Sequence, residues 1–207
     1  GHILGVGATG VWSAGGSLIT AVYHGGSAGI QNAAIKWGGF SPANEKDTEI
    51  YDGSTWSAGG DTPVTRVQDG TGTTNATLAF TTGSLEYNGT VWTTGPDMSV
   101  NHCEKGGSTG TQNAGIFFGG SYNVNAQCST EHYNGTSFTL GGNMNTARGY
   151  LSHFGEADNA AIAVGGYPDS CNTCTEEYNG TTWKNIAVVS TGRWGGSGFG
   201  TVNVGAI

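Results

Sequence analysis

Glutamates recur at one position of a repeated motif and are the first residues that could carry chemistry. Glu49, Glu131 and Glu176 each stand two residues before a tyrosine, and Glu86 and Glu177 each stand one residue before it. A pair of carboxyl groups could act as acid and base, or as acid and nucleophile, in glycoside hydrolysis. Catalysis would break the symmetry of a repeat at one or two positions, whereas these glutamates recur. We therefore expect them to belong to the scaffold, and we expect the protein not to be an enzyme.

The four cysteines offer disulfide or metal chemistry. Cys171 and Cys174 are close enough in sequence to form a local disulfide, and Cys103 could pair with Cys128. Disulfides favour an oxidising compartment, so we expect an extracellular location, either secreted or on a virion surface. A zinc site would need a second ligand pair at short spacing, which Cys171 and Cys174 lack, although His102, Cys103 and Cys128 could form a site by chance. We expect no metal and no cofactor.

A third group of residues has the composition of a sugar-binding surface. Aromatic rings stack on the C–H faces of sugars, and planar polar groups hydrogen-bond to sugar hydroxyls. Such residues follow or neighbour Gly-Gly pairs in three long connections: Phe40, Asn44, Tyr122, Asn123, Asn125, Tyr167 and Asp169. The same residues could instead cover the loop bases or make subunit contacts, because this composition also suits turns.

Four asparagines begin Asn-x-Thr sequons, the acceptor motif for N-glycosylation in secreted proteins: Asn75, Asn88, Asn134 and Asn179. The last three are also followed by glycine. Asn-Gly is the preferred pair of a two-residue type I′ hairpin turn, in which both residues have positive φ. A carbohydrate attachment site and a purely structural turn therefore remain alternatives at these positions.

An aromatic anchor recurs at intervals of about 36 to 46 residues, which is the range expected for propeller or solenoid repeats. The anchors are Trp12, Trp56, Trp92, Phe138 and Trp183. Each anchor belongs to a set of four short strand-like segments. Four antiparallel strands per repeat are typical of one propeller blade, so five anchors predict an all-β, five-bladed β-propeller that forms a single domain over residues 1–207.

The order Gly-Gly, Tyr, Asn-Gly or Asp-Gly, Trp and Arg resembles the kelch-repeat family, and the resemblance covers essentially the whole chain. It implies that the anchors and the repeat tyrosines pack between blades. The Gly-, Asn- and Thr-rich repeats are similar to kelch-like propellers of phage virions and environmental surface proteins, which implies a place in a virion or surface filament. The repeat tyrosines are Tyr51, Tyr87, Tyr133 and Tyr178.

The fifth repeat differs from the others, because Gly7 stands where the repeat tyrosine is expected. We expect residues 202–207 to pair with residues 1–7 and to close the ring, since closure removes free sheet edges. The same strands could instead pair between neighbouring molecules and produce a polymer.

The charge and composition of the chain limit the kinds of partner that we expect it to bind. The chain has 39 glycines, only 11% charged residues and a net charge of −8, with seven Lys plus Arg against fifteen Asp plus Glu. Nucleic acid and anionic membrane surfaces are therefore not expected partners, and no apolar run reaches the roughly 20 residues needed to span a bilayer. We expect a non-enzymatic extracellular structural or assembly protein that partners itself or other structural proteins. A lectin-like, carbohydrate-binding adhesin is the alternative.

Overall fold

Short antiparallel strands form nearly all the regular structure in the computed structural model of this chain, which describes residues 14–65, 67, 69–100, 105–122 and 125–206. Four sheets have four strands each in the described residues. The first contains β1 (Gly26–Ile30), β2 (Ala33–Trp37), β3 (Thr48–Tyr51) and β4 (Trp56–Ala58), and the second contains β5 (Asp69–Thr73), β6 (Ala76–Phe80), β7 (Gly83–Tyr87) and β8 (Trp92–Asp97).

The third and fourth sheets repeat this meander. The third contains β9 (Gly107–Thr111), β10 (Ala114–Phe118), β13 (Thr130–Tyr133) and β14 (Phe138–Leu140), and the fourth contains β15 (Ser152–Ala157), β16 (Ala160–Val164), β17 (Thr175–Tyr178) and β18 (Trp183–Asn185). The remaining elements are β11 (Ser121–Tyr122), β12 (Asn125–Ala126), the 3₁₀ turn η1 (Asp169–Cys171), β19 (Phe199–Thr201) and β20 (Val204–Ala206).

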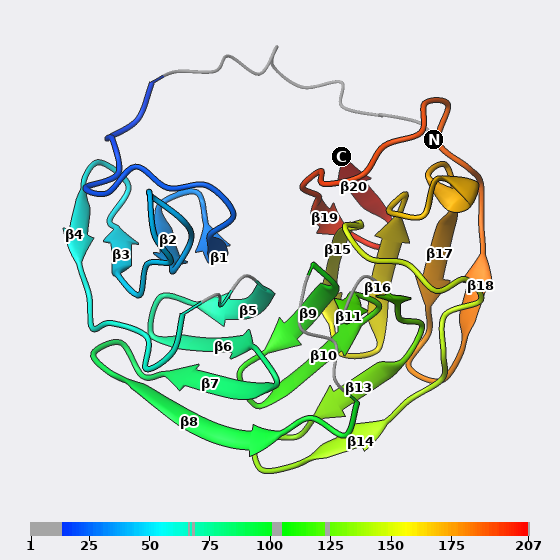
Figure 1. The fold of residues 1–207 in the computed structure, drawn as a ribbon, viewed down its shortest axis with the longest axis horizontal. Coiled ribbons are helices and arrows are strands. Elements are labelled where there is room, and N and C mark those ends of the chain that lie inside the picture. Colours follow the sequence, from blue (N-terminus) through cyan, green and yellow to red (C-terminus); the bar gives the residue numbers. More distant parts are fainter. Residues whose placement is uncertain (1–13, 66, 68, 101–104, 123–124, 207) are drawn as a thin grey trace.

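The sheets are arranged like the blades of a propeller. The first strand of each sheet lies near the centre and the fourth lies at the periphery (Figure 1). The central strands β1, β5, β9, β15 and β19 follow one another around the centre, each in contact with the next along this order. The prediction of an all-β, propeller-like fold is therefore confirmed.

The number of four-stranded sheets differs from the prediction, because the described residues contain four such sheets and not five. The two-stranded sheet β19–β20 lies beside β15, at the place where a fifth sheet would begin. The other expected strands of that sheet, around Gly7 and Trp12, fall in residues 1–13, which lie outside the described residues. Closure of the ring by residues 1–7 and 202–207 is consequently not shown.

The hydrophobic core lies between neighbouring sheets. One cluster joins Ile35 and Trp37 of the first sheet to Tyr87 and Trp92 of the second, and equivalent clusters fill the next two interfaces. The Trp92 indole N–H also donates a hydrogen bond of 2.9 Å to the Thr48 hydroxyl of the preceding sheet. Burial of such side chains contributes about 1.5–3 kcal/mol each, so adjacent sheets stabilise one another.

Three repeat glutamates are buried, and each one holds the segment that leads into its own sheet. The Glu131 carboxylate accepts the backbone N–H groups of Ser99 and Val100 at 2.8 and 2.7 Å. Glu49 and Glu176 accept equivalent N–H groups from Ile19 and Thr20 and from Asn145 and Thr146. These contacts agree with the scaffold role expected for the repeated glutamates.

The Asn-Gly turns have a different geometry from the one predicted. The prediction of a two-residue type I′ turn is wrong, because β7 and β8 pair Tyr87 with Trp92 and leave a four-residue loop between them. Only Gly89 of the pair has a positive φ, at 92°. The Asn88 side-chain oxygen instead accepts the N–H groups of Thr90 and Val91, which stabilises the longer loop locally.

Candidate functional site

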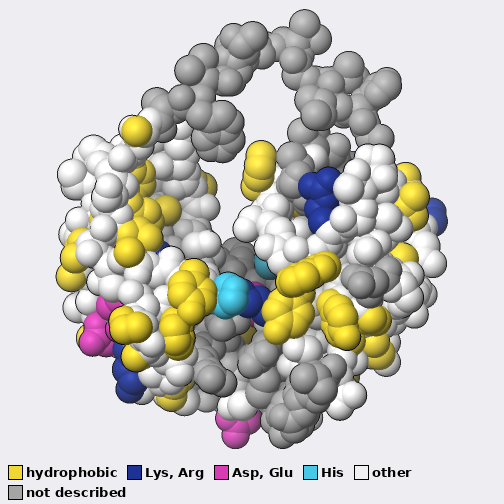
Figure 2. Space-filling model, turned by 45° about the horizontal axis from the view of Figure 1, so that its top comes forward, with side chains coloured by type: hydrophobic (Ala, Val, Ile, Leu, Met, Phe, Trp, Pro, Cys, Tyr) yellow, Lys and Arg dark blue, Asp and Glu magenta, His cyan; other side chains and the backbone are white. Residues whose placement is uncertain are grey.

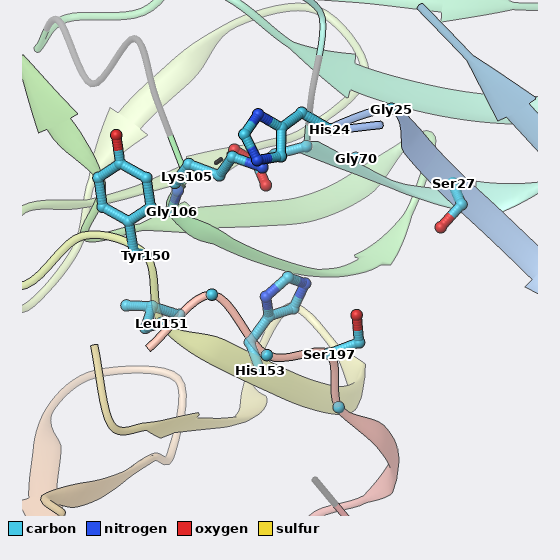
Figure 3. Close-up of a pocket in the computed structure, with 14 residues that line it drawn as sticks. His24, Gly25, Ser27, Gly70, Lys105, Gly106, Tyr150, Leu151, His153 and Ser197 are labelled. Carbon is cyan, nitrogen blue, oxygen red and sulfur yellow. Dashed lines mark hydrogen bonds between the residues drawn. The ribbon is translucent and has the colours of Figure 1, made fainter. Parts of the chain in front are cut away.

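A pocket of about 370 Å³ lies at the centre, where the innermost strands meet. Its walls come from β1, β5 and β15 and from the segments before β1, β9, β15 and β19, with much glycine and little apolar surface (Figure 3). The side chains with chemical functions are His24, Asp69, Lys105, Tyr150, His153, Ser27 and Ser197. This volume lies within the roughly 300–1,000 Å³ typical of small-molecule sites.

Three of these side chains project from backbone in the left-handed conformation. His24, Lys105 and Tyr150 have φ values of 59°, 54° and 53°, and each stands two residues before the first strand of a sheet. Gly195, four residues before β19, is also left-handed, with φ 70°. Backbone hydrogen bonds of 2.7 Å run from the Tyr150 N–H to the Lys105 carbonyl and from the Gly195 N–H to the Tyr150 carbonyl. Lys105, Tyr150 and Gly195 therefore form a hydrogen-bonded arc along the pocket that joins the segments before β9, β15 and β19.

Asp69, the first residue of β5, is the acidic group of the pocket. Desolvation raises the pKa of its carboxyl to about 6, against the opposing effects of the Lys105 charge and of backbone N–H groups, including that of Gly106 at 3.2 Å. Desolvation also lowers the pKa of His153 to about 4 and, together with the charge of Lys105, lowers the pKa of His24. At neutral pH the pocket thus presents one carboxylate, one ammonium group and two neutral imidazoles.

Aromatic side chains lie next to two of the residues that line the pocket. Tyr23 lies beside His24 and Phe40, with ring centroids 5.1 Å apart in both pairs, and Trp194 lies edge-on to Tyr150. Tyr23, Tyr167 and Trp194 are each more than half exposed. Figure 2 shows histidine and cationic side chains near the centre of this surface, between groups of hydrophobic side chains. We call Tyr23, Phe40, Tyr167 and Trp194 the aromatic rim.

The sequence-predicted sugar-binding residues are divided between the rim and positions away from it. Phe40 and Tyr167 belong to the rim, where they exchange backbone hydrogen bonds with Tyr23 and Gly149. Asn44 pairs with Phe40 in a short bridge. None of the predicted residues that the structure describes lines the central pocket.

The remaining predicted residues of this group fall in the short elements of the other long loops. Tyr122 and Asn125 pair in the small β11–β12 hairpin, and Asp169 begins η1. Asn123 lies outside the described residues. The structure therefore places the predicted surface in three separate loops, and only Phe40 and Tyr167 contribute to the aromatic rim.

Cys171 and Cys174 form the predicted local disulfide, in the loop after Tyr167. Cys128 keeps a free thiol beside the core between the third and fourth sheets, and its predicted partner Cys103 lies outside the described residues, as does His102. The described residues contain no cluster of His, Cys, Asp or Glu suited to a metal ion, and they form no helix long and apolar enough to cross a membrane.

The sequon asparagines are all exposed and lie in turns. Asn75, in the turn between β5 and β6, adjoins Gly89 in the loop between β7 and β8, which places two sequons close together. Asn134 and Asn179 occupy the loops of the third and fourth sheets that correspond to Asn88. Their side-chain oxygens cap these loops as the Asn88 oxygen does.

Sequence reasoning missed the central pocket, including His24, Lys105 and Tyr150. A signal for them exists, because His24, Tyr150 and Gly195 stand twelve residues after their aromatic anchors and Lys105 stands about as far after its own. The residue types differ so much that only the shared backbone conformation shows their equivalence. Comparison of the chain with protein-family models gives no match, and comparison with curated proteins gives none either.

Proposed function

We propose that the protein is a non-enzymatic, extracellular structural module, a five-bladed propeller that serves as a subunit or decoration of a virion or surface filament. Its partners would be further copies of itself or other structural proteins. The observation that carries this proposal is the two-stranded sheet β19–β20, which lies next to β15 where a fifth sheet of the ring would begin. A sheet edge is a template on which another strand can pair.

The segment after residue 13 supports the existence of a fifth blade. Glycines three residues after an anchor contact the tyrosine hydroxyl of the next sheet: a Cβ at Gly59 would lie 2.8 Å from the Tyr87 oxygen, and one at Gly141 would lie 2.7 Å from the Tyr178 oxygen. Gly15 has the same relation to Tyr51, at 3.2 Å. Gly15 therefore behaves as the end of an outer strand whose anchor would be Trp12.

The buried glutamates give the same register independently. Glu131 binds the N–H groups of the seventh and eighth residues after Trp92, and Glu49 binds those of Ile19 and Thr20, the seventh and eighth after Trp12. Because both relations point to Trp12, we propose that its strand and β19–β20 belong to one blade. That blade joins the two ends of the ring within one molecule, or joins neighbouring molecules when the strand is exchanged.

The extracellular part of the proposal is supported by the Cys171–Cys174 disulfide, since structural disulfides persist in oxidising compartments. The virion or filament part comes from the resemblance to kelch-like propellers. The exposed sequons at Asn75, Asn88, Asn134 and Asn179 would allow the protein to be a glycoprotein if it is secreted by a cell that modifies this motif.

The test of the assembly role is the mass of the protein in solution by light scattering, together with electron microscopy of the protein in its native material. We expect multimers, filaments or particle-bound discs, and we expect deletion of residues 1–7 to abolish them or to destabilise the fold. A species of only 21.1 kDa at all concentrations, with nothing bound to particles, would contradict the assembly role.

A second candidate function, carbohydrate binding by a lectin-like adhesin, is favoured by the aromatic rim. Exposed aromatic side chains gathered around a polar pocket are an arrangement that suits sugars, whose C–H faces stack on rings while their hydroxyls need polar partners. Hydrolysis would require two carboxyl groups, and Asp69 is the only one that lines the pocket among the described residues. The arrangement therefore supports binding rather than cleavage.

A further inference from the structure

We propose that the central pocket binds a single sugar unit, with Asp69 and Lys105 hydrogen-bonding to its hydroxyls and Tyr150 packing against its C–H face. This assignment rests on the carbohydrate-binding candidate described above. It differs from that candidate in placing the principal contacts in the pocket and not on the loop aromatics. Figure 3 shows the side chains of His24, Lys105 and Tyr150 on one side of the pocket, with His153 and Ser197 on the other.

Backbone conformation is the first line of support. The left-handed region disfavours residues with a Cβ, and glycine adopts it readily. Gly195 occupies this conformation before β19 and makes the same kind of backbone hydrogen bond to its neighbour as Tyr150 does. Glycine at positions 24, 105 and 150 would therefore satisfy the backbone conformation that the fold needs there. Strained positions that nevertheless carry histidine, lysine and tyrosine, all lining one pocket, indicate that these side chains are used.

The mixture of groups selects the ligand class. Each sugar hydroxyl can donate one hydrogen bond and accept others, so it needs acceptors and donors together. Asp69 supplies an acceptor, Lys105 supplies a donor, and the imidazoles and the hydroxyls of Ser27 and Ser197 can do either. A simple anion would meet the repulsion of Asp69, and an apolar ligand would remove water from the charged groups of Asp69 and Lys105 without offering a hydrogen bond in its place. A polyhydroxylated, uncharged ligand satisfies both constraints.

The aromatic rim extends the site beyond one sugar unit. Tyr23, Tyr167 and Trp194 are exposed, and Tyr23 and Trp194 adjoin the pocket residues His24 and Tyr150. Units attached to the bound sugar would leave the pocket across these rings. The pocket therefore determines which sugar is recognised, whereas the rim adds affinity for longer glycans.

The test is saturation-transfer NMR and titration with glucose, galactose, mannose, fucose, N-acetylglucosamine and N-acetylgalactosamine, followed by a glycan array. We expect at least one monosaccharide to bind. We expect Asp69→Asn and Lys105→Met to weaken its binding roughly tenfold or more, because each removes a charged hydrogen-bonding partner. Tyr167→Ala is the matched rim variant, and it should leave monosaccharide affinity within about threefold while lowering affinity for longer glycans on the array.

The dependence of binding on pH gives a second readout. Protonation of Asp69, whose pKa is about 6, removes its charge, so affinity should fall from neutral pH to about pH 5. The other titratable groups around Asp69 are Lys105, His24, whose pKa is lowered, and His153, whose pKa is about 4. Asp69→Asn should abolish most of this decrease. An unchanged pH profile in that variant would contradict the role of Asp69.

Glycine variants separate a functional role from a structural one. His24→Gly and Tyr150→Gly keep the backbone hydrogen bonds and relieve the left-handed strain, so the thermal midpoint should stay the same or rise. Sugar binding should nevertheless be weakened. A lowered midpoint with unchanged binding would show that these side chains stabilise the fold, and it would overturn their assignment to the site.

The remaining outcomes distinguish the pocket from the wider function. If the wild type binds glycans and the pocket variants bind equally well, but Tyr167→Ala does not bind, carbohydrate binding stands and the pocket assignment is overturned. If the wild type binds neither the free monosaccharides nor any glycan on the array, both the pocket assignment and the carbohydrate-binding candidate are wrong.

Discussion

Arg148 and Arg193 stand at the same position of the repeat, ten residues after their anchors, but their surroundings differ. Arg148 is completely buried and contacts the equally buried Glu176 at 2.9 Å, and it also donates to the carbonyl oxygens of Gly165 and Cys174. Arg193 is exposed. The same residue type therefore serves as an internal connection in one repeat and as a surface group in the next.

We predict that Arg148→Ala lowers the free energy of unfolding by about 3–5 kcal/mol, because it leaves the Glu176 carboxylate buried without its charged partner. Arg193→Ala is the matched control and should change the free energy of unfolding by no more than about 0.5 kcal/mol. Urea denaturation of both variants measures the difference. Equal stabilities of the two variants would show that the buried ion pair does not contribute to the fold.

At the scale of the elements, the strand that carries each buried glutamate is joined to the preceding linker. Glu131 in β13 accepts two backbone N–H groups from the segment between β8 and β9. The second sheet has Leu85 at the corresponding position, so its linker is held by other contacts. The hydrogen bonds that hold each linker to its own sheet therefore differ between the second sheet and the other three.

Glu131→Gln should therefore destabilise the protein by about 1–3 kcal/mol, since the amide keeps one oxygen for two buried N–H groups and turns its own donor toward the other. Glu177→Gln serves as the control because Glu177 follows the corresponding glutamate in β17 and is only partly buried. Hydrogen exchange of the Ser99 and Val100 amides provides a local measurement. Unchanged protection of both amides in Glu131→Gln would refute the proposed linkage.

At the scale of the whole molecule, the proposed assembly role depends on whether the ring is closed within one molecule or by a strand of a neighbouring molecule. The four described sheets share one register: the third residue after the repeat asparagine pairs with the sixth residue before the anchor, as Ile35 does with Ile50 and Ile116 with His132. Applied to the fifth repeat, the rule pairs Ala206 with Val6. This pairing is a prediction of the repeat and identifies the two positions at which closure can be tested.

The double variant Val6→Cys with Ala206→Cys should form a disulfide under mild oxidation, because directly opposed residues bring their Cβ atoms within bonding reach. Mass spectrometry and non-reducing electrophoresis distinguish a bond within one molecule, which means a closed ring, from bonds between molecules, which mean strand exchange. The single variants control for reaction with the natural cysteines. No new disulfide of either kind would contradict the register and both closure schemes.

The sequence by itself determined the repeat, the all-β class, the glycine-rich connections and the local Cys171–Cys174 disulfide, because each depends on short-range spacing. It gave the wrong geometry for the Asn-Gly loops, since the Asn88 side chain caps a longer loop than the dipeptide alone suggests. Only the tertiary structure decided that Arg148 is buried and Arg193 exposed. It alone revealed the pocket, because His24, Lys105 and Tyr150 come together through left-handed backbone at the centre of separate sheets. Residues so distant in the chain and so different in type share only their distance from the anchors, and convergence of the innermost strands is what makes them neighbours.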